Sequence, residues 1–295
     1  GFNKKINIFR GNLCDLKFLE DVFSKIYQSS KKIDGIIHFA GLKSVSESVR
    51  NPLIYWRTNL FATINLITLL RKYKCYNFVF SSSATIYKTN DYEILSENSE
   101  ISPVNPYGNT KYAIEILLKD FFKYSEKMKI ASLRYFNPIG AHESGLLGED
   151  PKGIPNNIFP LINNTALGLQ KELNIFGKDW PTHDGTPVRD YIHVMDLAEA
   201  HLKILEYLTK NNPIYRNVNV GTGIGTSVLE LIKVFERVNK IKVPYTFKNR
   251  RPGDVAHIVA DNSVLLSEFK IIPKRSIEDM CKDGWKWKKL NPTGY

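Results

Sequence analysis

Short apolar segments alternate with amphipathic segments over the first 137 residues of the chain. Four apolar runs, at residues 6–9, 33–40, 77–81 and 130–136, predict strands, and the intervals between them predict helices. The strands are apolar along their whole length, which is typical of parallel sheets that helices cover on both faces. We therefore expect an α/β fold built on a doubly wound parallel sheet.

Three of these strands end in small or polar residues. Ala40-Gly41 closes the second strand, Ser81-Ser82-Ser83 closes the third, and Phe136-Asn137 closes the fourth. Ligands of parallel α/β sheets bind beyond the carboxyl ends of the strands. We therefore expect these residues to contribute to one site.

A tyrosine and a lysine stand four residues apart after Pro106, which suits the first position of a helix that we expect to reach about residue 127. Tyr107 and Lys111 would then share one helix face, a turn apart. An ammonium near a phenol lowers the pKa of the phenol, so Tyr107 could act as a general base, with Ser83 sharing a substrate proton. Taken alone, the two patterns are more often a shared helix face and a plain strand-to-loop junction than a catalytic site.

The composition changes after Asn137. Residues 138–187 are rich in Gly, Pro, Asn and Asp, which predicts a loop-rich region that binds substrate. Further strands are expected at residues 188–194 and 217–220, and helices at 197–208, capped by Asp196, and at 228–238. We expect a first domain at residues 1–137 and a smaller α+β domain at residues 138–295, with a segment of about 188–223 returning to the first.

The glycine-rich segment Gly221–Ser227 follows an expected strand and precedes an expected helix. That context suits a dinucleotide-binding loop, but Thr226 stands at the third glycine position and no acidic residue closes a second strand. The alternative is a glycine turn in which Ser227 caps the helix.

The formal net charge of +11 raises the question of nucleic-acid binding. The basic residues are scattered singly and in pairs, which indicates a lysine-rich surface; a phosphorylated small substrate would also suit the positive field. Three distant cysteines, Cys14, Cys75 and Cys281, argue against disulfides and zinc, and no apolar run reaches the length of a membrane span. We expect no nucleic acid, no metal, no membrane and a cytoplasmic location.

Several longer strings are similar to those of the UDP-glucose 4-epimerases, a family of extended short-chain dehydrogenases/reductases. They are His38-Phe-Ala-Gly-Leu-Lys43, Phe80-Ser-Ser-Ser-Ala-Thr-Ile-Tyr87, Leu133-Arg-Tyr-Phe-Asn-Pro-Ile-Gly-Ala-His142, Gly148-Glu-Asp-Pro-Lys-Gly-Ile-Pro-Asn-Asn157, Asp184-Gly-Thr-Pro-Val-Arg-Asp-Tyr-Ile-His-Val-Met-Asp196 and Arg250-Arg-Pro-Gly-Asp254. The resemblance extends over essentially the whole chain. It implies a Rossmann-like fold, NAD as cofactor and a UDP-sugar as substrate.

The resemblance also implies roles for individual residues. Tyr107 would be the catalytic base, Lys111 its partner, which also holds the nicotinamide ribose, and Ser83 the residue that binds the sugar 4-hydroxyl. The NAD site would include Asn12, Leu13, Phe39, Ala40, Gly41, Leu42, Lys43, Thr58, Ser83, Tyr107, Lys111 and Phe136. The UDP-sugar would contact Ser83, Tyr107, Asn137, Asn156, Asn157, Phe176, Arg189, Arg251 and Asp254. The two arginines could also be plain surface charges, although their forked guanidinium groups suit a diphosphate.

The chain departs from the family pattern at a few positions. Asn12 stands where the family has an Asp that contacts the adenine, and Thr58 stands where an Asn contacts the cofactor. Pro187 and Pro252 interrupt matching strings. The family's opening strand, Gly-rich turn and helix, which bind the NAD pyrophosphate, are also absent from the sequence, so we expect residues 1–295 alone to bind NAD poorly.

The expected activity is the NAD-dependent interconversion of UDP-glucose and UDP-galactose through a 4-keto sugar, as part of galactose metabolism. Three alternatives remain: a 4-epimerase for another UDP-sugar, a sugar-nucleotide 4,6-dehydratase, or a catalytically inert binding protein. Ala84-Thr85 replaces the acidic pair that a dehydratase would carry after Ser83. Tyr107, Ser83 and Lys111 together argue against an inert protein.

A homodimer is expected because the helices at about 53–74 and 107–127 carry apolar residues on more than one face. These are Leu60, Phe61, Leu66 and Leu69 on the first helix, and Tyr112, Ile116 and Phe122 on the second. Two copies could pack them into a four-helix bundle, as is common in the family. The alternative is that all of these residues are interior.

Overall fold

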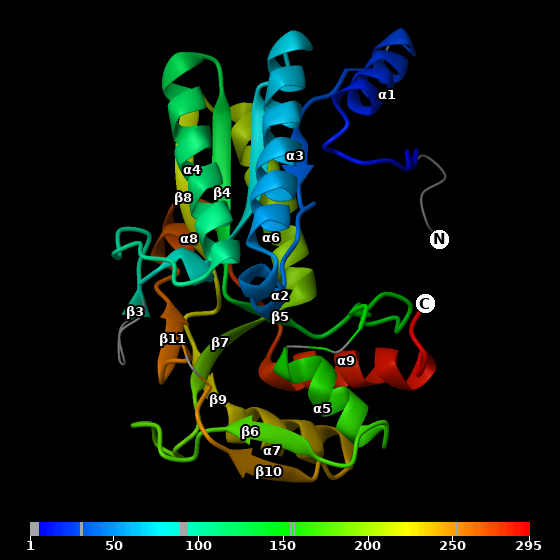
Figure 1. The fold of residues 1–295 in the computed structure, drawn as a ribbon, viewed down its shortest axis with the longest axis vertical. Helices are drawn as coiled ribbons and strands as arrows, with labels where there is room; N and C mark the ends of the chain where they lie inside the picture. Colours follow the sequence, from blue (N-terminus) through cyan, green and yellow to red (C-terminus); the bar gives the residue numbers. More distant parts are fainter. Residues whose placement is uncertain (1–5, 30–31, 89–93, 154, 156, 252) are drawn as a thin grey trace. The chain divides into compact units, whose positions relative to one another are not determined.

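The computed structural model describes residues 6–29, 32–88, 94–153, 155, 157–251 and 253–295 (Figure 1). The contacts divide the chain into two units. The first unit comprises Gly1–Ser82, Asn105–Ser132 and Leu205–Arg216. The second unit comprises Ser83–Val104, Leu133–Ile204 and Asn217–Tyr295.

A four-stranded sheet has the strand order β1-β2-β4-β8. Its strands are β1 (Ile36–His38), β2 (Asn77–Ser83), β4 (Lys129–Tyr135) and β8 (Ile214–Val220). β1 and β2 are parallel, with Ile36 opposite Phe78. Nearly every residue of β2 and β4 is buried, as expected for strands that are apolar along their whole length.

The helices of the first unit are α1 (Leu16–Gln28), α2 (Val45–Arg50), α3 (Pro52–Lys72) and α4 (Pro106–Tyr124). α3 and α4 lie side by side and are in contact (Figure 1). Leu69 and Leu70 of α3, Ile114 and Leu118 of α4 and Phe78 of β2 meet in one apolar core. Burial of these side chains stabilises the two helices on the sheet, at about 1.5–3 kcal/mol for each large apolar side chain.

The second unit carries a five-stranded sheet and a two-stranded one. Its elements are η1 (Ala84–Ile86), β3 (Ile94–Leu95), β5 (Asn137–Ile139), α5 (Ile158–Ala166), β6 (Leu173–Phe176), β7 (Val188–His193), β9 (Gly225–Ser227), α7 (Val228–Asn239), β10 (Tyr245–Lys248), β11 (His257–Ala260), α8 (Ser263–Ser267) and α9 (Ile277–Leu290). α6 (Val194–Lys210) begins in this unit. The larger sheet has the order β3-β11-β7-β5, β9 pairs with β7 in antiparallel fashion, and β6 pairs in parallel with β10.

The core of the second unit lies between its helices and strands. Phe159 of α5, Tyr191 of β7, Phe235 of α7 and Trp285 of α9 belong to one buried cluster. Figure 1 shows α7 beside the β6–β10 pair, and α7 and α9 are in contact. The packed core includes Tyr191 of β7, β11 pairs with β7, and these two strands carry several of the residues described below.

The structure confirms the α/β fold with parallel strands but corrects three local predictions. Residues 6–9 form no strand: Ile6 and Ile8 are 69% and 77% exposed, and no described strand pairs with them. Unpaired backbone groups gain nothing from an extended conformation. The second predicted strand is shorter, since β1 has only three residues.

The third correction concerns Asp196. It lies in the first turn of α6, which begins at Val194, so it does not cap the helix. Its carboxylate instead accepts hydrogen bonds from the backbone N–H groups of Lys274 (3.1 Å) and Arg275 (2.9 Å). Within the described ranges, no helix is long and apolar enough to cross a membrane.

Candidate active site

Lys111 lies on the buried side of α4, with 4% of its surface exposed. The helix begins where the sequence predicts: Asn105 caps it by accepting from the N–H of Gly108 (2.9 Å), and Pro106 occupies its first position. This start places Lys111 one turn into the helix, next to β2. The Nζ atom of Lys111 donates a hydrogen bond to the carbonyl oxygen of Ser81 (2.8 Å).

Two aromatic rings flank the Lys111 ammonium. Nζ lies 4.9 Å from the ring centroid of Phe80 and 5.8 Å from that of Tyr107. Burial lowers the pKa of Lys111 to about 8, because the charged form loses its hydration. The structure thus brings Tyr107 and Lys111 together, with a cation beside the phenol ring.

The loop after β1 reaches the same lysine. A Cβ atom at Gly41 would lie 3.1 Å from Asn59 Oδ1, which is a tight contact, and 3.6 Å from Lys111 Nζ, so a side chain there would press on Asn59 and touch the lysine. Phe39, Ala40 and Lys43 are exposed, and Leu42 is half-buried. The loop therefore offers backbone surface close to Lys111.

Asn59 of α3 fixes this loop, and the sequence analysis did not single it out. Its side chain accepts from the N–H of Leu42 (2.8 Å) and donates to the carbonyl of Leu42 (3.1 Å) and to Thr110 Oγ1 (3.0 Å). Thr110 in turn donates to the carbonyl of Tyr107 (2.8 Å). Its neighbour Thr58 is half-buried. An asparagine inside an apolar helix was the available signal, because a buried amide needs partners.

Ser83 is the last residue of β2 and the first residue of the second unit. Its Oγ atom accepts hydrogen bonds from the N–H (3.2 Å) and the hydroxyl (2.9 Å) of Thr85. The side chain is largely buried, with 9% exposed. The Ser-Ser-Ser-Ala-Thr segment is thus a strand end that turns at once into the short helix η1.

Four of the residues expected to bind UDP gather in the second unit. The guanidinium of Arg251 stacks on the ring of Phe176 at 4.4 Å and forms an ion pair with Asp254 (3.1 Å). Arg189 of β7 is half-buried and donates to the carbonyl of Val188 (2.8 Å). Burial lowers the pKa of the Arg189 guanidinium, and the Asp254 charge opposes that shift.

The remaining predicted residues are more dispersed. Phe136 is buried, Asn137 begins β5, and Asn157 is exposed at the start of α5. Asn156 lies outside the described residues. Asn12 accepts from the N–H of Cys14 (2.9 Å), and Leu13 is half-buried. The Oδ1 atom of Asn12 is thus engaged within its own turn.

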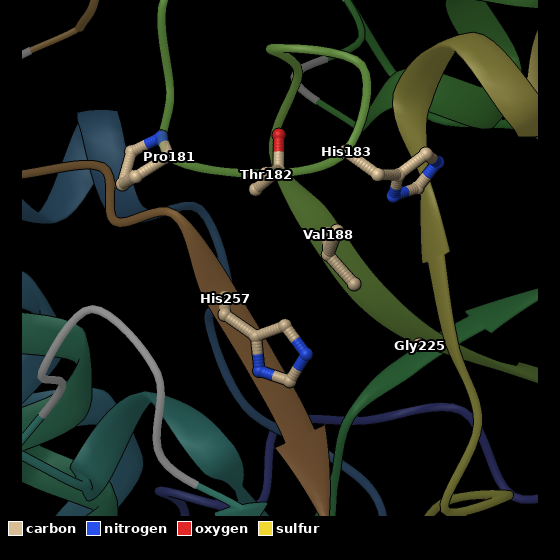
Figure 2. A pocket seen from close by; sticks show the side chains of 6 residues that line it. All are labelled: Pro181, Thr182, His183, Val188, Gly225 and His257. Carbon is tan, nitrogen blue, oxygen red and sulfur yellow. The ribbon is translucent and has the colours of Figure 1, made fainter.

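A cavity of about 370 Å³ opens on the second unit (Figure 2). It is lined by Pro181, Thr182, His183, Val188, Gly225 and His257. Side chains alternate along a strand, so Val188 and its neighbour Arg189 point to opposite faces of β7. The cavity contains none of the predicted site residues and lies on the other face of that strand.

The glycine-rich segment binds a carboxylate of the protein itself. Asp190 of β7 accepts from Thr222 N (2.8 Å), Thr222 Oγ1 (2.7 Å) and Gly223 N (2.9 Å). Ser227 caps α7 in a capping box with Glu230. The glycine-turn interpretation is therefore confirmed.

Comparisons with known proteins agree with this architecture. A family model described as GDP-mannose 4,6 dehydratase matches residues 1–284. The UDP-glucose 4-epimerase of Pasteurella multocida (strain Pm70) is 45% identical over 293 residues, which cover 99% of this chain and 85% of the relative. That of Bacillus subtilis (strain 168) is 44% identical over 292 residues, or 99% and 84% of the two chains.

Solved structures show the same similarity. The UDP-glucose 4-epimerase from Bifidobacterium longum in complex with NAD+ and UDP has a TM-score of 0.91 and 41% identity, covering 99% of this chain and 85% of that one. The epimerase from Stenotrophomonas maltophila with bound NAD and formylated UDP-arabinopyranose has a TM-score of 0.91 and 41% identity, covering 96% and 82%.

The parallel α/β fold, the Tyr107–Lys111 pair on α4 and the glycine loop beside it define an extended short-chain dehydrogenase/reductase. Within that class, the curated relatives that are 44–45% identical to this chain, over 99% of its length, are UDP-glucose 4-epimerases. The chain belongs to the UDP-glucose 4-epimerase family.

Proposed function

We propose that the protein interconverts UDP-glucose and UDP-galactose by oxidation and reduction at C4 of the sugar. The observation that carries this proposal is the buried ammonium of Lys111, held between Ser81 and the ring of Tyr107. A cation in that position favours the phenolate form of Tyr107, which a general base requires. The epimerases that this chain resembles at 44–45% identity support the choice of reaction.

The residues around Lys111 fit a nicotinamide cofactor. Gly41 leaves room beside Lys111 Nζ that a side chain would fill, and Leu42 is fixed by Asn59. NAD would supply the hydride acceptor and donor for the reaction at C4 of the sugar. Lys111 would hold the nicotinamide ribose, and the loop of residues 39–43 would line the nicotinamide half of the site.

The proton of the sugar 4-hydroxyl is handled by the chain's own residues. Tyr107 accepts it as phenolate, and Lys111 stabilises that phenolate. Ser83 forms a hydrogen bond to the 4-oxygen. Because Lys111 is tethered to Ser81 of β2, the charge that favours the phenolate is already in place before substrate binds.

The UDP end of the substrate would be held by the second unit. Arg189 and Arg251 offer guanidinium groups to the diphosphate, and Phe176 offers an apolar ring already covered by Arg251. We propose the same substrate contacts for Asn137, Asn156, Asn157 and Asp254. In this scheme residues 1–137 form the NAD-binding domain and residues 138–295 the UDP-sugar-binding domain, with about 188–223 returning to the first.

The dehydratase alternative has one observation in its favour, which is the description of the matching family model. Ala84-Thr85 opposes it, because η1 places no carboxylate directly after Ser83. Incubation of the intact protein with UDP-galactose and NAD distinguishes the two reactions. Formation of UDP-glucose supports the epimerase, formation of a dehydrated 4-keto-6-deoxy sugar supports the dehydratase, and an unchanged substrate contradicts both.

We further propose that the protein acts in galactose metabolism, in the cytoplasm and as a homodimer. The three cysteines are free thiols, as a reducing compartment would maintain. Phe61 and Ile64 of α3 and Ile116 of α4 expose 49%, 38% and 45% of their surfaces. Leu66 and Leu69, in contrast, are buried within the first unit, so they are unavailable to a partner.

A further inference from the structure

Two consecutive arginines in the second unit, Arg250 and Arg251, each stack on an aromatic side chain. The guanidinium carbon of Arg250 lies 4.0 Å from the ring centroid of Trp180. That of Arg251 lies 4.4 Å from the ring centroid of Phe176. Phe176 ends β6 opposite Lys248, which ends β10, so the two chains leave this parallel pair at the same end. The two stacks therefore join the segments that follow the paired strands.

Trp180 has little freedom to move. Only 7% of its surface is exposed, and its indole N–H donates to the carbonyl of Phe176 (3.1 Å). Gly177 adopts a φ of +89°, and a Cβ atom there would collide with the indole nitrogen. The turn therefore needs glycine at this position, and the close packing keeps the indole against Arg250.

Arg250 is held by Asp179 as well as by Trp180. Its Nε atom forms an ion pair with Asp179 Oδ1 (3.0 Å), and its Nη2 atom donates to the carbonyl oxygen of the same residue. A planar guanidinium can form these bonds and stack on a ring at the same time, whereas the compact ammonium of a lysine cannot. Because exposed ion pairs contribute little by themselves, the stack on the buried indole is the firmer of the two anchors.

Arg251, in contrast, presents its guanidinium to the solvent. Its side chain is 52% exposed and forms an ion pair with Asp254, three residues further on. Such an exposed pair is weak, so a diphosphate could take the place of the carboxylate. Besides burial, which lowers the pKa of the Arg189 guanidinium, the charges of Asp254 and Arg251 act on that group. The three side chains thus share one patch of the second unit.

We propose that Arg250, stacked on Trp180, is a positioning residue that holds Arg251 in place for the diphosphate of the UDP-sugar. The two arginines are neighbours in the chain, so an anchor at residue 250 limits where the guanidinium of Arg251 can reach. A cation that is already in place binds an anion more tightly, because less conformational freedom is lost on binding. The inference rests on the proposed function, and it gives roles to two residues, Arg250 and Trp180, that act without contacting the substrate.

Calorimetry of the intact protein with UDP tests this role in Arg250→Lys, which keeps the charge but loses the planar stack. UDP should bind about tenfold more weakly, as expected for the loss of one charge-assisted hydrogen bond. KM for UDP-galactose should rise by a similar factor, while kcat should change by less than about threefold. Arg237→Lys is the matched control: Arg237 of α7 forms an exposed ion pair with Glu278 (2.7 Å), and its replacement should leave the affinity for UDP unchanged.

Two variants of Trp180 separate the stack from the stability of the turn. Trp180→Tyr keeps a ring against Arg250 and should bind UDP within about threefold of wild type, whereas Trp180→Leu should match the loss in Arg250→Lys. Uridine, which carries no phosphate, should bind equally to wild type and to every variant. A variant that weakens uridine as much as UDP would indicate a disordered turn and would overturn the inference. If Trp180→Leu fails to fold, the comparison of Arg250→Lys with Trp180→Tyr takes its place.

A double-mutant cycle tests whether Arg250 acts through Arg251. In an Arg251→Ala background, Arg250→Lys should weaken UDP binding no further. Multiplying losses would overturn the inference, as would a wild-type affinity for UDP in Arg250→Lys. A wild-type protein that binds no UDP would contradict the proposed function itself, whereas a wild type that binds UDP, with multiplying losses in the cycle, contradicts only the role of Arg250.

Discussion

Lys111 of α4 and Ser81 of β2 are joined by a hydrogen bond: the lysine ammonium donates to the serine carbonyl oxygen over 2.8 Å. The carbonyl belongs to a buried strand and the ammonium to a buried turn of helix, so neither partner can easily reorient. The bond fixes a positive charge beside the Tyr107 ring. The predictions below follow from that arrangement and from its surroundings.

Tyr107→Phe should lower kcat by about two to four orders of magnitude, because the variant loses the general base. The affinity for UDP should stay nearly intact, since the phenol acts at the sugar. Steady-state kinetics and calorimetry with UDP measure the two effects. Tyr124→Phe removes a hydroxyl from the exposed end of the same helix and serves as the control. A Tyr107→Phe variant that kept more than a tenth of the rate would falsify the assignment.

Lys111→Met should inactivate the enzyme and at the same time stabilise the fold. The pKa of Lys111 falls from 10.5 to about 8 on burial, so the charged lysine costs up to about 3 kcal/mol at pH 7. Because the folded pKa is depressed, this cost disappears as the pH rises from about 8 to 10.5. Denaturant unfolding at pH 7 and at pH 10.5 should show a gain for Lys111→Met that shrinks at the higher pH. If Lys111→Met were less stable than wild type at pH 7, the buried lysine charge would not be destabilising.

The buried side chain of His38 should make the fold less stable at acidic pH. Burial, followed by the charge of Lys111, lowers the pKa of His38 to about 4, and its Nε2 atom lies 3.1 Å from Thr63 Oγ1. As the pH falls from 6.5 to about 4, His38 is protonated in the unfolded chain but stays neutral in the folded chain. The free energy of unfolding therefore falls by up to about 3 kcal/mol.

The free energy of unfolding, measured from pH 7 to pH 4, checks this prediction. In His38→Gln it should fall less steeply with pH than in wild type. His183→Gln replaces a side chain that is 57% exposed and should leave the slope unchanged. Equal slopes in wild type and His38→Gln would place the acid sensitivity elsewhere.

The proposed dimer predicts that charge on α3 and α4 disrupts assembly. Phe61→Asp or Ile116→Asp should convert the protein to a monomer at micromolar concentration, because a carboxylate would be buried without a partner. Light scattering measures the mass. Leu202→Asp, at a position 59% exposed on α6, should leave the dimer intact. A wild-type protein that is already monomeric would exclude the assembly.

Helices and their ends could be predicted from the sequence where the capping residues and the apolar periodicity agree. Pro106 begins α4 and Ser227 caps α7, as the pattern of each segment indicates. Residues 6–9 show the limit of this approach. Their apolar character suits a strand, but a strand also needs a neighbouring strand, which composition does not reveal.

Sites were predictable where the residue type itself implies the chemistry. Tyr107 and Lys111 could be paired by their spacing, and the structure brings them together. Asn59 was missed because its importance comes from three hydrogen bonds, two to a loop and one to another helix. Those partners lie 17 and 51 residues away along the chain, beyond the reach of any local pattern.

The turn at Gly221–Gly223 has the backbone geometry of an anion-binding loop, and the anion it holds is the chain's own Asp190. A Cβ at Gly221 would lie 2.5 Å from the Asp190 carboxylate, and Gly223 adopts a φ of +74°, so both glycines are needed for this closure. A glycine pattern can therefore serve an internal set of hydrogen bonds between a turn and a neighbouring strand. In this chain, a search for phosphate loops by glycine spacing alone would mistake a turn that binds an internal carboxylate for a cofactor site.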